Sequence, residues 1–168
     1  MKKNAKRICE LKPKTIYKKN KLRLEFPEES RHLKKKSKPS PKRPEFGYHS
    51  KVEASPDLEK WVQIDLGERV DIRKIVLHAC HDSFNNIGAG FGFPVRFKLI
   101  ASNRQDFSRS QVLVDKSGSD FPNPGLMPLD YKTESSARFL RVHATKLARR
   151  AANDYNFALA EVEVLDST

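Results

Sequence analysis

Short runs of alternating apolar and polar residues, separated by turn-forming residues, constrain the fold of this chain more than any other feature. The runs follow Phe46 and include residues 61–66, 70–80 and 95–101. Successive side chains of a β-strand point to opposite faces, so a period of two predicts strands that are buried on one face. We find no amphipathic helical pattern of comparable length, which indicates an all-β domain.

Further strands are predicted at residues 111–115, 139–145 and 158–165. In the last of these, alternation places Ala160, Val162 and Val164 inward and the glutamates between them outward. Trp61, which opens the first strand, is expected in the core. Six or seven strands at this spacing are typical of an antiparallel β-sandwich.

The net charge of +12 lies entirely in residues 1–46, which hold 17 Lys and Arg against 5 Glu. In residues 47–168 the basic and acidic side chains balance, 16 against 16. The Lys, Pro and Ser stretch at 34–44 cannot hold a helix or strand, so we interpret 1–46 as a disordered basic tail. Such a tail is typical of solvated segments and also of segments that bind nucleic acid or an anionic surface.

Export and membrane signals are not predicted. No apolar run approaches the roughly 18 residues that cross a bilayer, and the basic N-terminus is not followed by the apolar stretch of a signal peptide. Cys9 and Cys80 lie in different environments and do not form a disulfide framework or a metal-ligand pattern.

Three long connections, at residues 81–94, 117–128 and 149–156, interrupt the strands. Two of them carry amides, carboxylates and an aromatic ring that suit hydrogen bonds with sugar hydroxyls and stacking on a sugar face. These candidate ligand-binding residues are His81, Asp82, Asn85, Asn86, Asn153, Asp154, Tyr155 and Asn156. The alternative, that they are turn formers bonded to their own backbone, has at least an equal claim.

The glycine-rich segment at 88–92 lacks the strand and helix of a phosphate-binding loop, so its glycines are expected to permit a tight bend. Phe91 and Phe93 are either an exposed platform for a sugar or a plug of the core. His78, His81 and Asp82 do not converge on a metal at strand spacing. We also find no pair of carboxylates or nucleophile motif typical of a hydrolase.

Three motifs in order resemble the discoidin family, also called the coagulation factor 5/8 type C domain. They are Trp61-Val-Gln-Ile-Asp-Leu-Gly67, Ile72-Arg-Lys-Ile-Val-Leu77 and Phe157-Ala-Leu-Ala-Glu-Val-Glu-Val164, and the resemblance covers about residues 47–166. It implies a galactose-binding-like jelly-roll sandwich of about eight strands, without catalysis, whose end loops bind a sugar or an anionic lipid head group. The segment at 78–94 resembles a variant found in modules attached to large bacterial proteins that act on polysaccharides, which implies a secreted or periplasmic setting.

The chain departs from the family pattern before Trp61, where the first strand and a calcium-binding loop are not matched. We therefore expect an N-terminally truncated fragment of a larger secreted protein, with a foreign segment at 1–46. At the other end, the carbonyl of Ala160 and the carboxylate of Glu161 match family positions that contribute to a structural calcium site. One carboxylate is few for an ion that takes six to eight oxygens, so we expect this site to be incomplete.

The sequence thus predicts a non-catalytic carbohydrate-binding module at residues 47–168, whose partner is a glycan or polysaccharide. The rival hypothesis is binding of nucleic acid or an anionic surface through residues 1–46. It predicts an affinity that falls steeply with added salt.

Overall fold

The computed structural model describes residues 47–82 and 88–166, and of Asp82 only the backbone. The described chain is all-β, as the alternation predicts, and its main sheet has the order β11-β2-β7-β5-β6 with every neighbouring pair antiparallel. The strands of this sheet are β2 (Lys60–His78), β5 (Arg96–Ser102), β6 (Gln111–Lys116), β7 (Leu129–Lys146) and β11 (Glu161–Leu165). The predicted basic tail at 1–46 lies outside the described residues, so the proposed domain division stays a prediction.

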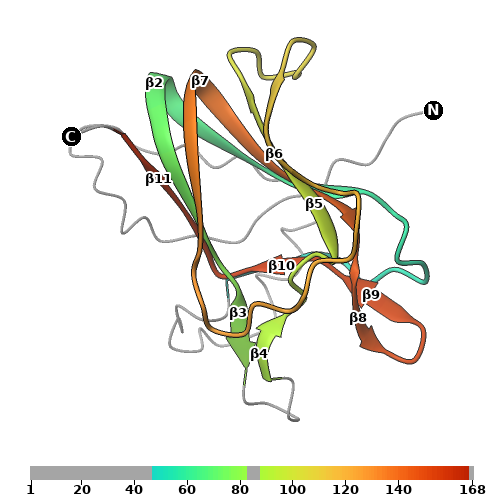
Figure 1. Cartoon of the computed structure of the whole chain (residues 1–168). Helices are drawn as coiled ribbons and strands as arrows, with labels where there is room; N and C mark the ends of the chain where they lie inside the picture. The colour runs from blue at the N-terminus through green and yellow to red at the C-terminus, as the bar shows by residue number, and fades with distance from the viewer. Residues whose placement is uncertain (1–46, 83–87, 167–168) are drawn as a thin grey trace, which may run out of the picture.

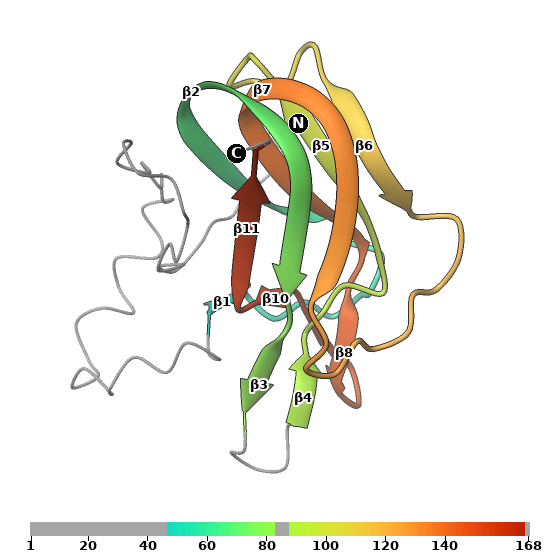
Figure 2. The ribbon, with the colours of Figure 1, turned by 60° about the vertical axis from the view of Figure 1, so that its left-hand side comes forward.

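Two long strands, β2 and β7, bend together and belong to both layers of a sandwich. The first half of β2 and the second half of β7 join β5 and β6, whereas their other halves join β11. Figure 2 shows the two strands curling over one end of the molecule. The predicted strands at 61–66 and 70–80 are therefore one bent strand, with a register shift between Asp65 and Val70 and a positive φ of 88° at Gly67.

Three small two-stranded sheets lie outside the main sheet. They are β1 (Tyr48–His49) with β10 (Ala158–Leu159), β3 (Cys80–Asp82) with β4 (Gly88–Phe91), and β8 (Ala148–Ala151) with β9 (Asp154–Asn156). The segments at 81–94 and 149–156, expected as irregular connections, thus contain β-hairpins. Figure 1 places both hairpins at the same end of the sandwich.

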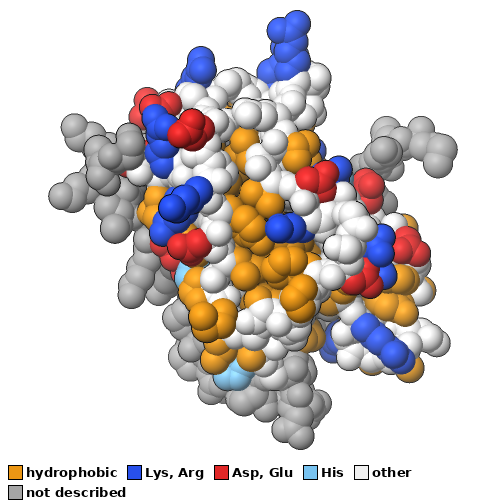
Figure 3. All heavy atoms as spheres, in the orientation of Figure 1, with side chains coloured by type: hydrophobic (Ala, Val, Ile, Leu, Met, Phe, Trp, Pro, Cys, Tyr) orange, Lys and Arg blue, Asp and Glu red, His pale blue; other side chains and the backbone are white. Residues whose placement is uncertain are grey.

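The core lies between the two layers and draws side chains from both halves of β2. Val62 and Ile64 from the first half and Ile75 and Leu77 from the second belong to one buried cluster. Phe97 is fully buried there and makes edge contacts with the rings of Phe93 and Phe121. Figure 3 shows one face on which a band of hydrophobic side chains runs between groups of charged ones.

The prediction that Trp61 lies in the core is wrong. The phase of the strand follows Val62, Ile64 and Leu66, which are all buried, so alternation directs Trp61 to the outer face. Lys60 points inward instead, with 6% of its side chain exposed and its ammonium paired with the carboxylate of Glu53. Burying three apolar side chains on one face of the strand stabilises the fold more than burying the single tryptophan on the other face.

No helix within the described ranges has the length and hydropathy of a membrane span.

Candidate functional site

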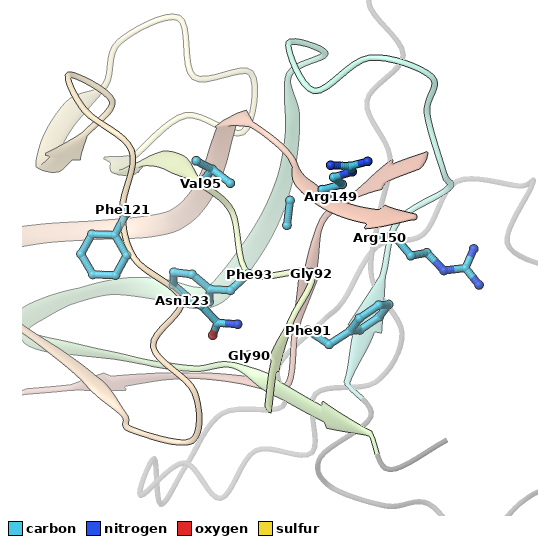
Figure 4. A pocket seen from close by; sticks show the side chains of 10 residues that line it. Gly90, Phe91, Gly92, Phe93, Val95, Phe121, Asn123, Arg149 and Arg150 are labelled. Atoms are coloured by element: carbon cyan, nitrogen blue, oxygen red, sulfur yellow. The ribbon is translucent and has the colours of Figure 1, made fainter. Parts of the chain in front are cut away.

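A cavity of about 310 Å³ lies at the end of the sandwich that carries the two hairpins. Three segments far apart in the sequence enclose it: β4 with the residues after it, the connection at 117–128, and β8. The lining residues are Gly90, Phe91, Gly92, Phe93, Val95, Phe121, Asn123, Ala148, Arg149 and Arg150. Figure 4 shows Phe91 and the two arginines on one side of this pocket, and Phe121 and Val95 on the other.

The glycines predicted to permit a bend form one wall of the pocket. Gly90 and Gly92 have φ values of 77° and 66°, which disfavour any residue with a side chain. A Cβ atom at Gly90 would lie 1.6 Å from Oδ1 of Asn123, and one at Gly92 would lie 2.6 Å from Cβ of Ala158. The glycines therefore allow β4 to approach two distant segments closely, and the pocket forms where these segments meet.

The two phenylalanines of this segment have different roles. Phe93 is 4% exposed and belongs to the core, as one of the two alternatives predicts. Phe91 is half-buried, lines the pocket, and has its ring centroid 5.1 Å from that of His49. The rings of Phe91 and of Phe121, which is also half-buried, are thus the aromatic surfaces that the pocket offers to a ligand.

The charged side chains of the pocket are both arginines, and none of its ten lining residues is acidic. Arg149 donates from Nε and Nη2 to the carbonyls of Ala151 and Ala152, at 3.1 and 3.3 Å, which holds the tip of its own hairpin. Arg150 is exposed and extends outward from the pocket rim in Figure 4. The pocket is therefore rich in hydrogen-bond donors and positively charged.

The amide of Asn123 is occupied by contacts that shape the pocket. It donates to the carbonyl of Ala89 at 3.1 Å and accepts from the backbone N–H of Gly125 at 2.8 Å. These two bonds join the connection at 117–128 to β4. Asn123 therefore has a structural role before any ligand binds.

Two of the first four predicted ligand-binding residues, His81 and Asp82, lie on β3. His81 is half-buried in β3, with its backbone paired to Ala89, and the backbone of Asp82 pairs with Gly88. Asn85 and Asn86 lie outside the described residues.

The second predicted group lies on the β8–β9 hairpin, which also carries the two pocket arginines. Asn153 is exposed, Asp154 is half-buried, and the ring of Tyr155 packs against the core. Asn156 is 2% exposed, and its Oδ1 has no hydrogen-bond partner among the described residues. None of the five predicted residues whose side chains the structure describes lines the pocket, and the assignment of all eight as ligand-binding residues stays a prediction.

Sequence reasoning missed the residues that do line the pocket on the hairpin, Arg149 and Arg150. They fall within the connection at 149–156, from which the prediction took only the Asn, Asp and Tyr residues. Two adjacent arginines in a segment whose domain has no net charge were a signal that could have been used. Only the tertiary structure shows that this hairpin and the glycines at 90–92 line the same pocket.

The predicted calcium position lies elsewhere, at the start of the edge strand β11. Glu161 lies opposite His78 on β2, and Nε2 of His78 is 2.6 Å from Oε1 of Glu163. The ligand atoms of these three side chains all lie within 4.8 Å of one another. Calcium takes six to eight oxygen ligands, whereas this group combines two carboxylates with an imidazole nitrogen. These three side chains are not the all-oxygen set that calcium prefers, and the predicted calcium site at the Ala160 carbonyl and Glu161 stays a prediction.

Comparison with known proteins addresses the fold. No protein-family model matches the sequence, and no curated protein matches it significantly. Among solved structures, a chitosan-binding module of a chitosanase/glucanase from Paenibacillus sp. IK-5 has a TM-score of 0.50 at 16% identity, over 71% of this chain and 76% of that one. The module CBM32-3 of a family 31 glycoside hydrolase from Clostridium perfringens has a TM-score of 0.51 at 20% identity, over 68% and 71%.

The module CBM32-1 of a family 31 glycoside hydrolase from Clostridium perfringens has a TM-score of 0.51 at 15% identity, over 71% of this chain and 75% of that one. The chain thus has the galactose-binding-like β-sandwich fold of these modules. The fold implied by the resemblance to the discoidin family is confirmed. A shared fold does not by itself establish a shared ligand, so function has to be argued from the pocket.

Proposed function

We propose that this protein is a non-catalytic carbohydrate-binding module whose ligand occupies the pocket between β4, the connection at 117–128 and β8. The single observation that carries the proposal is the pocket lining, which combines the half-buried aromatic rings of Phe91 and Phe121 with hydrogen-bond donors. Small-ligand sites are concave and combine apolar surface with a few convergent polar groups, and this pocket likewise combines aromatic rings with polar side chains. The modules that share the fold bear the names of carbohydrate-binding modules, which supports the proposal.

The chemistry of the lining supports binding rather than catalysis. None of the ten lining residues is Asp, Glu, His, Ser, Cys or Lys. Glycoside hydrolysis generally uses two carboxylic acids on opposite sides of the scissile bond, and other hydrolyses need a nucleophile with a base. The pocket offers neither.

Binding would use the ring of Phe91 and the guanidinium of Arg150. The apolar face of a pyranose ring stacks on an aromatic side chain, while a guanidinium donates several hydrogen bonds to hydroxyl or acidic oxygens. A site of this size gives weak affinity unless several modules act together. This agrees with our proposal that the module serves as one part of a larger secreted protein that acts on polysaccharides.

A glycan array probed with the full chain, followed by titration calorimetry on the best ligand, tests the proposal. We expect Phe91→Ala and Arg150→Ala each to weaken binding at least about tenfold, since each removes about 1–2 kcal/mol of contact. Arg109→Ala is the matched control, because Arg109 is an exposed arginine in the connection between β5 and β6, at the opposite end of the sandwich.

The same variants distinguish glycan binding in the pocket from the rival hypothesis, binding through the basic tail. Binding of anionic polymers through residues 1–46 would persist in Phe91→Ala and would fall steeply as salt is added. A folded protein that binds no glycan, or a glycan affinity unchanged in both pocket variants, would overturn the proposal.

A further inference from the structure

His78, Glu161 and Glu163 form a compact group on the outer face of the sheet edge. Glu161 and Glu163 are two residues apart on β11, so alternation places both on one face, and Glu161 is the direct cross-strand partner of His78. Figure 2 shows β11 lying alongside β2. One imidazole and two carboxylates thus converge from two neighbouring strands, with all ligand atoms within 4.8 Å of one another.

The group has an excess of negative charge. The side chains of His78 and Glu163 are 29% and 28% exposed, so solvent screens them only in part. Among the residues that the structure describes, no Lys or Arg forms an ion pair with Glu161 or Glu163. The nearest lysine in the ladder, Lys74, pairs with Asp130 instead. Two neighbouring carboxylates therefore share one imidazole, an arrangement that a bound cation would stabilise.

The donor atoms indicate which cation fits. An imidazole nitrogen favours zinc and other first-row transition metals, whereas calcium and magnesium prefer oxygen ligands alone. We propose that His78, Glu161 and Glu163 bind a divalent transition-metal ion, with Zn²⁺ as the reference ion. The site is independent of the carbohydrate pocket, which uses other residues.

The geometry requires only a small adjustment. Zinc–ligand bonds of about 2.0–2.1 Å place tetrahedral ligands roughly 3.3 Å apart. His78 and Glu163 are already closer than this, at 2.6 Å, so a metal ion would move between them and replace their direct contact. Glu161 is half-buried on an edge strand and can reach the ion by rotating its side chain. The fourth position would be left to water.

A metal ion in this place would act as a cross-link. β11 is an edge strand, held on one side only by its ladder with β2. An ion bound by His78 from β2 and two residues from β11 joins the strands through their side chains. Because a ligand that binds only the folded state stabilises it, the melting temperature should rise with metal concentration.

Calorimetry and thermal melts on the chelator-treated full chain test the inference, with Zn²⁺ and, in parallel, Ca²⁺ as probes. We expect Zn²⁺ to bind and raise the melting temperature, and Ca²⁺ to do neither. Co²⁺ provides a spectroscopic readout, because a tetrahedral site with nitrogen and oxygen ligands gives visible absorption.

Variants assign the site. His78→Ala, Glu161→Gln and Glu163→Gln should each weaken Zn²⁺ binding by about tenfold or more. His143→Ala is the matched control, because His143 is a half-buried strand histidine that pairs with a single carboxylate, Glu59, at 3.3 Å. Should His78→Ala fail to fold, Glu161→Gln on the edge strand tests the site instead, with Co²⁺ absorption as the readout. Zn²⁺ affinity that is unchanged by Glu161→Gln and Glu163→Gln, or absence of Zn²⁺ binding by the folded chain, would overturn the inference.

Discussion

The guanidinium of Arg141 lies 3.9 Å from the centre of the Trp61 ring on the outer face of the sheet. The centre of the Phe107 ring also lies 3.8 Å from this guanidinium, and Nη2 donates to Oε1 of Gln63 at 2.7 Å. Burial lowers the pKa of Arg141 to about 10, because the charge is partly removed from water. Stacking on two aromatic faces offsets part of that cost. The stack thereby fastens the segment around Phe107, whose φ is 56°, to the sheet.

Replacing the tryptophan should have only a moderate effect on stability. Trp61→Ala removes a partly exposed ring and one cation–π contact, so we expect a loss of about 1–2 kcal/mol. Leu99→Ala, at a fully buried position, is the control and should cost about 2–5 kcal/mol. Urea unfolding followed by circular dichroism measures both. A Trp61 variant as unstable as the Leu99 variant would contradict the outward orientation.

The inward ion pair of Lys60 and Glu53 should show strong coupling. Glu53→Gln leaves the Lys60 ammonium, 6% exposed, without its carboxylate, which should cost about 3 kcal/mol. Lys60→Met combined with Glu53→Gln should restore most of that loss, because an apolar side chain then replaces the buried charge. A double-mutant cycle by denaturant unfolding checks this, and additive losses would show that the pair contributes little.

Cys80 should make stability fall at alkaline pH. Burial raises the pKa of the Cys80 thiol to about 12 from an ordinary value of 9.0. Below pH 9 both the folded and unfolded chains hold the neutral thiol, so this contribution to stability is fully present. Between pH 9 and 12 only the unfolded chain loses the proton, and stability falls by up to about 1.4 kcal/mol for each pH unit.

Cys80→Ala should reduce the fall of stability with pH in the alkaline range. The part of that fall due to other groups, such as Tyr131, should remain. Burial also raises the pKa of Tyr131, to about 12. Unfolding curves of both proteins at pH 8 to 11 give the comparison. An identical pH dependence in the variant would show that the thiol is accessible to water in the folded state.

Gly92→Ala should damage the pocket wall. The new Cβ would lie 2.6 Å from Cβ of Ala158, at a φ that disfavours alanine, and a loss of about 2 kcal/mol or more follows. Gly118→Ala is the control, because a Cβ there meets no atom within 4 Å. Thermal melts of both variants measure the difference. Equal melting temperatures would mean that the segment after β4 moves freely.

The class of fold follows from the local pattern of apolar and polar residues. Apolar residues recur with a period of two at Val62, Ile64 and Leu66, and again at Leu140 and Val142. Side chains with this spacing all face one core only when the segment is a β-strand. The three motifs then indicated a galactose-binding-like sandwich, and comparison with solved structures confirmed it. Local patterns suffice here because alternation is a property of neighbouring residues, which the sequence contains in full.

The residue clusters on which the proposed functions depend arise from tertiary packing. The pocket joins Phe91 to Arg149 and Arg150, nearly sixty residues away, where the glycines let the chain at 90–92 approach Asn123 and Ala158 closely. The group of His78 with Glu161 and Glu163 depends on the register between β2 and β11, and a shift of one residue would separate its members. Register and close approach arise from the packing of distant segments, which no local pattern encodes. For this reason the sequence predicted the fold, whereas the residues lining the pocket emerged only from the structure.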